Sequence, residues 1–206
     1  MLMHKRYLKF TATLILTVGL AFIVNAQESE NSPEIKTALF AGGCFWCIEA
    51  DFEKLDGVVD VVSGYTGGAA NTADYKTVTY KKTGHFEAVK VSYDPTQVSY
   101  AELVDYFWKH IDPTDSRGQF CDKGDSYKSA VFYASNEEKQ IIEQSIEQLN
   151  ATKSFSEDIV TTVAAAKPFY LAETYHQDYY KKNPIRYNYY RKGCGRDARV
   201  EELWGK

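Results

Sequence analysis

Two cysteines lie three residues apart in the segment AGGCFWCIEA, residues 41–50, and a Phe-Trp pair separates them. This C-x-x-C spacing is typical of a redox dithiol, because two thiols one helical turn apart are close enough to form a disulfide. The spacing alone leaves Cys44 as either a nucleophile or a buried structural thiol. Phe45 and Trp46 are likewise either core residues or an apolar wall beside a reactive sulfur.

The residues on either side place Cys44 at a strand-to-helix junction. The pattern predicts a short apolar strand at residues 37–41 and a helix at residues 44–55. At the start of a helix, free backbone N–H groups and the helix dipole are expected to lower the pKa of the Cys44 thiol. Gly42 and Gly43 allow a tight turn that keeps the sulfur accessible.

A second candidate for chemistry is Glu87, in a strand predicted at residues 85–93. Alternate side chains of a strand point to opposite faces, so Glu87 shares its face with two valines. If that face is the core, the carboxyl is poorly hydrated and stays protonated near neutral pH. If instead Phe86 and Ala88 mark the core face, Glu87 is solvated. The valine face is the one we predict to be buried.

The remaining pattern predicts strands and helices in mixed order, which is typical of a two-layer α+β domain. Ser99 and Glu102 form a capping-box pattern at the start of one helix, and Asn136 is the predicted cap of another. The tail, residues 184–206, shows no clear period. The other predicted strands are residues 57–65, 129–135 and 158–166, and the other predicted helices are residues 99–111, 137–150 and 171–183.

The N-terminal residues have the pattern of a secretory signal peptide. A basic start is followed by the apolar run FTATLILTVGLAFIV, and Val24 and Ala26 stand at the −3 and −1 positions of a cleavage site. We therefore predict a signal peptide at residues 1–26 and a linker at residues 27–36. The domain then works outside the cytoplasm, in the periplasm or beyond if the source is bacterial, where disulfides persist. The alternative is an uncleaved membrane anchor.

Composition excludes several functional classes. The 206 residues carry a formal net charge of −4 with no basic block, so nucleic acid is not an expected partner. The chain has no paired C-x-x-C motifs of the zinc type and no glycine-rich phosphate loop. We expect no metal and no organic cofactor.

Five blocks in order resemble the A-type peptide methionine sulfoxide reductases: GGCFWC, TGHFEAVKVSYDP, CDKGDSYKSAVFY, YHQDYY and NPIRYNYYRKGCGRDARVEELWG. The resemblance extends from about Thr37 to Gly205. It implies a ferredoxin-like α/β sandwich with a long, loop-rich C-terminal segment, in one domain at residues 37–206. It also implies reduction of methionine (S)-sulfoxide, free or in oxidised proteins, with a thioredoxin-like reductant as partner. Monomer is the default oligomeric state.

The resemblance assigns a role to each matching residue. The Cys44 thiolate attacks the sulfoxide sulfur and becomes a sulfenic acid, and Glu87 protonates the leaving oxygen. Tyr75 and Tyr127 hold that oxygen, a role that only their motif positions suggest in a chain with 16 tyrosines. The residues that match the substrate pocket are Phe45, Trp46, Asp122, His176 and Tyr179.

A resolving thiol must then reduce the sulfenic acid. Many family members have glycine at the position of Cys47, so the resemblance assigns it no role. Cys194 lies between Gly193 and Gly195, which predicts a flexible segment able to reach the active site. We therefore rank Cys194 first as the resolving thiol and Cys47 second, with Cys121 as a buried or auxiliary thiol.

Two other classes of function stay open at this point. One is a thiol–disulfide oxidoreductase that uses the C-x-x-C pair, which the bulky Phe-Trp pair argues against. The other is a non-catalytic binding domain that keeps the pocket, which the presence of both Cys44 and Glu87 argues against.

Overall fold

The computed structural model describes residues 34–205. The predicted signal peptide and residues 27–33 of the predicted linker lie outside these residues. Within them, no helix is long and apolar enough to cross a membrane. The linker was predicted one residue too long, since Lys36 already pairs with Tyr93 in the first strand.

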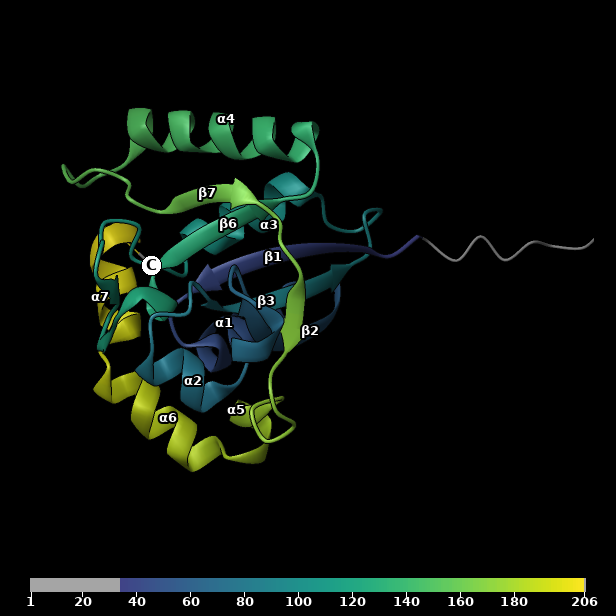
Figure 1. Cartoon of the computed structure of the whole chain (residues 1–206). Coiled ribbons are helices and arrows are strands. Elements are labelled where there is room, and N and C mark those ends of the chain that lie inside the picture. Colours follow the sequence, from purple (N-terminus) through teal and green to yellow (C-terminus); the bar gives the residue numbers. More distant parts are fainter. Residues whose placement is uncertain (1–33, 206) are drawn as a thin grey trace, which may run out of the picture. The chain divides into compact units, whose positions relative to one another are not determined.

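Six strands form one mixed sheet in the order β7-β6-β1-β3-β2-β8 (Figure 1). Neighbouring strands are antiparallel except for the parallel pair β6 and β7. A separate two-stranded ladder joins β4 to β5. The strands are β1 (Lys36–Gly42), β2 (Val58–Thr66), β3 (Phe86–Tyr93), β4 (Gly118–Gln119), β5 (Asp122–Lys123), β6 (Ser129–Tyr133), β7 (Thr162–Ala165) and β8 (Phe169–Leu171).

Helices α1 (Phe45–Phe52) and α3 (Tyr100–Trp108) pack on the same face of the sheet. Phe40 of β1 is fully buried, and its ring lies 4.8 Å from Phe52 of α1 and 5.1 Å from Phe107 of α3. These aromatic contacts form the centre of the main core, as expected for two-layer packing. The α+β prediction is confirmed.

The ends of two helices test the capping predictions. The capping box at Ser99 and Glu102 is present at the start of α3. The prediction of Asn136 as a cap was wrong, because the Ser135 hydroxyl accepts the Glu138 N–H and α4 (Asn136–Thr152) begins one residue earlier.

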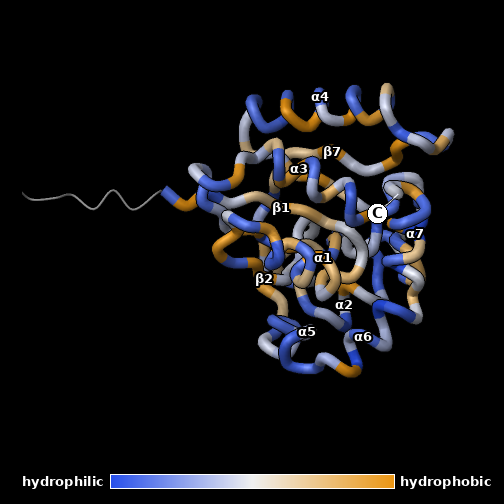
Figure 2. The backbone as a smooth tube through the Cα atoms, turned by 180° about the vertical axis from the view of Figure 1, so that it is seen from behind, coloured by the Kyte–Doolittle hydropathy of each residue, from blue (hydrophilic) through white to orange (hydrophobic). Residues whose placement is uncertain are grey.

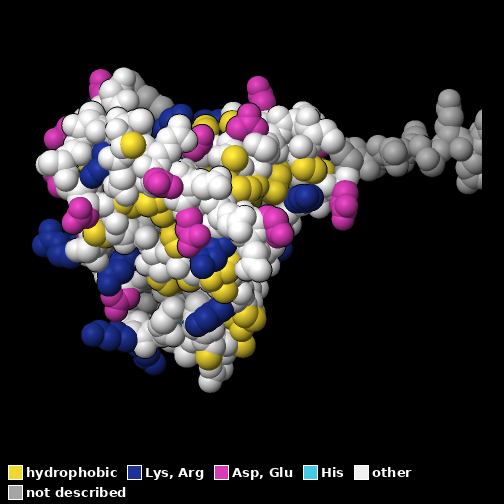
Figure 3. All heavy atoms as spheres, turned by 90° about the horizontal axis from the view of Figure 1, so that it is seen from above, with side chains coloured by type: hydrophobic (Ala, Val, Ile, Leu, Met, Phe, Trp, Pro, Cys, Tyr) yellow, Lys and Arg dark blue, Asp and Glu magenta, His cyan; other side chains and the backbone are white. Residues whose placement is uncertain are grey.

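Along α4, hydrophilic and hydrophobic residues alternate (Figure 2). On the face of the molecule that carries α4, the described acidic and basic side chains are interspersed (Figure 3).

The C-terminal segment is mostly loop with two short strands at residues 153–178 and mostly helical at residues 179–204, so the prediction of a loop-rich segment is wrong only for its last part. It contains α5 (Tyr179–Lys182), α6 (Pro184–Gly193) and α7 (Arg196–Trp204), drawn at the yellow end of the colour scale in Figure 1. The rest of the helix predicted at residues 171–183 is strand and turn. The tail shows no period because α6 and α7 each bury few side chains, chiefly Tyr187, Arg196 and Leu203.

Candidate active site

Seven of the predicted site residues surround one cavity of about 70 Å³. They come from parts of the chain far apart in sequence: the start of α1, the start of α2 (Tyr75–Tyr80), strands β3 and β5, and a 3₁₀ turn at Asp125–Tyr127. Tyr190 of α6 completes the lining. The residues around the cavity are Cys44, Phe45, Trp46, Tyr75, Glu87, Asp122, Tyr127 and Tyr190.

Cys44 stands at the N-cap of α1 and is buried. Gly43 before it has a φ of +83°, a conformation that a side chain would strain. The predicted lowering of the Cys44 pKa was wrong, because burial raises it well above the usual value. The first helical N–H, from Phe45, donates to Glu87 Oε2 at 3.2 Å instead of to the sulfur. Cys44 therefore rests as a thiol.

Glu87 lies on the buried face of β3, as the alternation of side chains predicted. Its side chain is 2% exposed. Burial raises the pKa of Glu87 to about 8, although hydrogen bonds from the Phe45 N–H and the Tyr127 hydroxyl favour the charged form. At neutral pH the carboxyl therefore carries a proton that it can donate into the cavity.

Two tyrosine hydroxyls border the same space. Burial raises the pKa of Tyr75 to about 12 and raises that of Tyr127 further, so both stay protonated and can donate hydrogen bonds. Tyr75 is fixed because its own N–H donates to Glu173 Oε1 at 2.9 Å. Asp74 caps the same short helix by accepting the Thr77 N–H at 3.0 Å.

His176 and Tyr179 lie behind Trp46 rather than in the cavity lining. The indole Nε1 of Trp46 donates to His176 Nδ1 at 3.0 Å. The Tyr179 ring stacks on the indole with centroids 3.7 Å apart and an interplanar angle of 7°. The two residues hold the aromatic wall in place, one by a hydrogen bond and the other by stacking.

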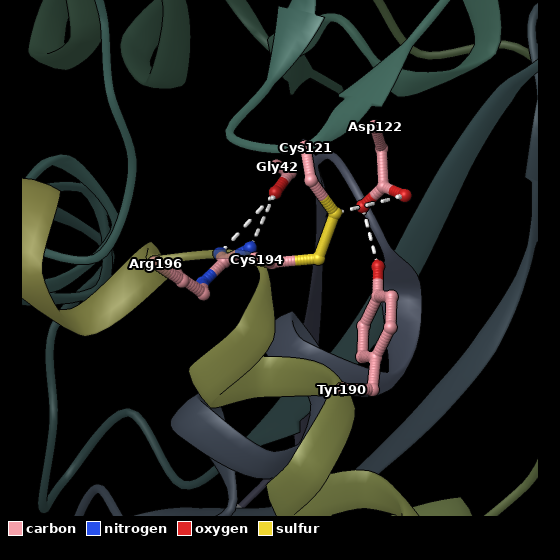
Figure 4. Close-up of a disulfide and its surroundings, with 6 residues drawn as sticks. All are labelled: Gly42, Cys121, Asp122, Tyr190, Cys194 and Arg196. Atoms are coloured by element: carbon pink, nitrogen blue, oxygen red, sulfur yellow. Dashed lines mark hydrogen bonds between the residues drawn. A yellow bond between two sulfur atoms is a disulfide. The ribbon is translucent and has the colours of Figure 1, made fainter.

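Tyr190 is the lining residue that sequence reasoning missed. Its hydroxyl donates to Asp122 Oδ2, which fixes that carboxylate at the rim (Figure 4). Nothing in the sequence distinguishes Tyr190 from the other tyrosines, and the tail was not predicted to be helical. If α6 had been predicted from the sequence, Tyr190 would have been placed one helical turn before Cys194.

The four cysteines form two pairs. Cys121 and Cys194 are joined in a disulfide beside Asp122 (Figure 4), whereas Cys44 and Cys47 are free and buried. Two predictions are corrected. Cys121 is exposed rather than buried, since it lies in the surface turn between β4 and β5. The segment predicted to be flexible at Cys194 is the end of α6, where the Cys194 N–H donates to Tyr190 O.

Two clusters among residues 34–205 bring potential metal ligands together. In the cluster of Cys121, Asp122 and Cys194, the two sulfurs are already bonded to each other. In the second, Glu49 accepts hydrogen bonds from the Asp178 N–H and the Ser63 hydroxyl. We assign neither as a metal site. The clusters are Cys121, Asp122 and Cys194, and Glu49, Glu53 and Asp178.

The cavity combines a nucleophilic sulfur, a buried acid, two hydroxyl donors and an aromatic wall. Such a set suits a substrate with an electrophilic centre, an oxygen that accepts a proton and a small apolar group. The cavity is small, with a volume of about 70 Å³, which suits the end of a side chain.

Comparison with known proteins gives one consistent family. Residues 36–206 match the family described as peptide methionine sulfoxide reductase. The chain is 47% identical over 173 residues to peptide methionine sulfoxide reductase MsrA of Bacillus velezensis, covering 84% of this chain and 98% of that protein. It is 42% identical over 208 residues to MsrA/MsrB of Vibrio cholerae, covering 98% of this chain but only 55% of that longer protein.

Two solved structures are also similar. Reduced Mxr1 from Saccharomyces cerevisiae matches with a TM-score of 0.69 and 34% identity, covering 74% of this chain and 87% of that one. Methionine sulfoxide reductase A of Corynebacterium diphtheriae matches with a TM-score of 0.66 and 32% identity, covering 75% of this chain and 78% of that one.

Proposed function

The chain belongs to the peptide methionine sulfoxide reductase family, and on that basis we propose that it reduces methionine (S)-sulfoxide, free or in oxidised proteins, with Cys44 as the nucleophile. The observation that carries the proposal is the cavity in which the Cys44 sulfur, the protonated Glu87 and two tyrosine hydroxyls meet beside Trp46. A sulfoxide offers each of these groups a partner: a sulfur to attack, an oxygen to protonate and a methyl group to pack.

The first step transfers the oxygen. The Cys44 sulfur attacks the sulfoxide sulfur while Glu87 gives its proton to the oxygen, and the proton lost from Cys44 returns to Glu87. The oxygen passes to Cys44, which becomes a sulfenic acid, and methionine leaves. Tyr75 and Tyr127 donate hydrogen bonds to the oxygen as charge builds on it, which is a preorganised stabilisation of the transition state.

The second step forms a disulfide, and here we place Cys47 before Cys194. Cys44 and Cys47 are both free, and their side chains are hydrogen-bonded to each other. Cys194 is held by Cys121. Cys47 attacks the sulfenic sulfur, so that an S–S bond forms, the S–O bond breaks and water leaves.

The Cys121–Cys194 pair then acts as a relay to the surface. Once reduced, Cys194 attacks the Cys44–Cys47 disulfide, and Cys121 resolves the mixed disulfide to give the pair seen in Figure 4. Exposure of Cys121 supports this order, because an external dithiol can reach it. We propose a thioredoxin-like protein as that dithiol.

An assay with the two sulfoxide epimers tests the function. With dithiothreitol as reductant, the protein should convert methionine (S)-sulfoxide to methionine and leave the (R) epimer unchanged. A general thiol–disulfide oxidoreductase would instead reduce protein disulfides without acting on the sulfoxide. A binding domain would bind the (S) epimer and release no methionine. Either of these two results would exclude the proposed activity.

Truncation of the aromatic wall gives a prediction of its own. Trp46→Ala should lower kcat/KM for the sulfoxide about 10- to 100-fold, the range that loss of a small apolar contact produces. The Cys44 thiol should stay reactive toward iodoacetamide, because the helix start is unchanged. Tyr189→Ala, which truncates an aromatic side chain 83% exposed, is the control and should behave as wild type. If alkylation slows as much as turnover, Trp46 is structural.

Three finer features complete the proposal. We propose that the fold is ferredoxin-like: the antiparallel order β6-β1-β3-β2, with α1 and α3 as connections, matches the β-α-β-β-α-β arrangement. Residues 1–26 act as a cleaved signal peptide that directs the domain to the periplasm or beyond, which N-terminal sequencing of the exported protein would test. The enzyme is a monomer, which light scattering would test.

A further inference from the structure

A buried cluster of charged residues lies beside Cys47 and has no part in the steps above. We infer that Arg196, with Arg191, is a positioning residue for disulfide formation: the two guanidinium groups hold Cys47 as the thiolate that attacks the Cys44 sulfenic acid. This inference rests on the proposed function, since it concerns the second step of the same reaction.

Arg196 is unusually buried for an arginine, with 2% of its surface exposed. Its Nη1 and Nη2 atoms donate to the Gly42 carbonyl at 3.2 Å (Figure 4). Nη2 also donates to the His110 carbonyl at 2.9 Å. The guanidinium carbon lies 4.6 Å from the centre of the Phe120 ring. Arg196 is therefore fixed against the residue that begins the Gly-Gly turn before the catalytic cysteine.

The charged groups around it are buried to different degrees. Asp51 of α1 is also buried and faces both arginines, with Arg191 Nη1 at 2.9 Å from Oδ1 and Arg196 Nε at 3.7 Å from Oδ2. Neither Asp51 Oδ2 nor Arg196 Nε has a hydrogen-bond partner among the described residues. Arg191 also pairs with Asp197, but that side chain is 66% exposed. The buried Arg196 and the partly buried Arg191 thus face one buried carboxylate, and Asp197 pairs with Arg191 from the surface.

Cys47 lies next to these two arginines. It stands four residues before Asp51 on α1, so the two side chains share a face of the helix. It packs with Tyr187 of α6, whose hydroxyl accepts a hydrogen bond from Arg191 Nη1 at 3.0 Å. The hydrogen bond with Cys44 and the charges of Arg196 and Arg191 lower the pKa of Cys47, against the effects of burial and of the Asp51 charge.

The pKa values of the two cysteines are therefore shifted in opposite directions before the reaction begins. Cys44 is a thiol that donates to the Cys47 sulfur, and Cys47 is the better anion. After Cys44 has become a sulfenic acid, attack by the Cys47 thiolate forms the S–S bond, and the hydroxide that leaves takes a proton to become water. Thiolate, not thiol, is the attacking species, so a cation that stabilises it raises the reactive fraction.

Four variants of the full chain test the inference in a Cys121→Ser/Cys194→Ser background, where only Cys44 and Cys47 can react. Arg196→Gln and Arg191→Gln remove one charge each, and Arg196→Lys keeps the charge. Arg199→Gln is the control, because Arg199 pairs with Asp112 and Glu202 and not with Asp51. For each variant, quenched-flow mass spectrometry follows methionine release and Cys44–Cys47 disulfide formation after one addition of sulfoxide without reductant.

We expect both Gln variants to slow disulfide formation tenfold or more while methionine release changes less than threefold. Sulfenic acid should accumulate and react with dimedone. Arg196→Lys should recover part of the rate, and the control should match the parent. The pH at which Cys47 is half alkylated, measured with Cys44→Ser present, should move upward in both Gln variants.

Three results would overturn the inference: unchanged disulfide formation, equal slowing of both steps, or an unshifted alkylation profile. Arg191 is less buried than Arg196, so its variant keeps the test open if Arg196→Gln does not fold. Absence of methionine release in the parent would instead refute the proposed function.

Discussion

Cys44→Ser is expected to abolish methionine formation under every condition, including with excess dithiothreitol. The oxygen is transferred to the sulfur of this residue, and none of the other three cysteines lines the cavity that holds Glu87 and the tyrosine hydroxyls. The measurement is methionine released per enzyme, by chromatography. Product formation by this variant above the rate without enzyme would mean that another thiol is the nucleophile.

The same measurement separates the other thiols by stoichiometry. Prereduced wild type has four thiols and should release about two equivalents of methionine without reductant, since each disulfide formed accounts for one. Cys194→Ser should stop after one, with a Cys44–Cys47 disulfide, and its turnover with a thioredoxin-type donor should collapse. Cys47→Ser should also release one and retain a sulfenic acid.

The opposite pattern would support Cys194 as the first resolving thiol, as ranked from the sequence. If Cys47→Ser releases two equivalents, forms the Cys121–Cys194 disulfide with the first and retains a sulfenic acid only after the second, Cys194 resolves Cys44 directly. In that case the C-x-x-C pair is not the first disulfide, and the role inferred for Arg196 has no step on which to act.

Features with a local cause were predictable from the sequence. The burial of Glu87 follows from alternation along one strand, and the capping box at Ser99 follows from side-chain spacing. The junction at Cys44 was placed correctly because strand and helix patterns meet there. In each case a few consecutive residues decide the outcome.

Features that depend on distant residues were not predictable. The pKa of Cys44 rises chiefly because folding buries the sulfur, and the neighbouring Cys47 and the distant carboxyl groups of Glu87 and Asp122 raise it further. The pairing of Cys121 with Cys194 spans 73 residues and needs the tail to fold back. Arg196 gave no signal, since an isolated arginine in a polar tail is normally exposed.

Glu87→Gln is the second change with a large expected effect. A positioned general acid contributes about 10²–10⁴ in rate, so single-turnover methionine release at pH 7 should fall by that factor. Glutamine matches the shape of glutamate and can still accept the Phe45 N–H, so the fold should persist, which urea unfolding would verify. Alkylation of Cys44 should change little, because the sulfur is not altered.

The pH dependence of this effect separates an acid from a structural residue. The ratio of wild-type to variant rates removes most of the effect of Cys44 ionisation, because burial and Cys47, which both proteins share, raise the pKa of Cys44 more than the Glu87 charge does. Because burial raises the pKa of Glu87 to about 8, wild type loses its acid as the pH rises through 8, and the ratio should fall. Below neutral pH the ratio should also fall, because solvent protons replace the missing acid in the variant. A ratio that stays constant from pH 5 to about 10 would remove Glu87 from proton transfer and leave it a purely structural contact to α1.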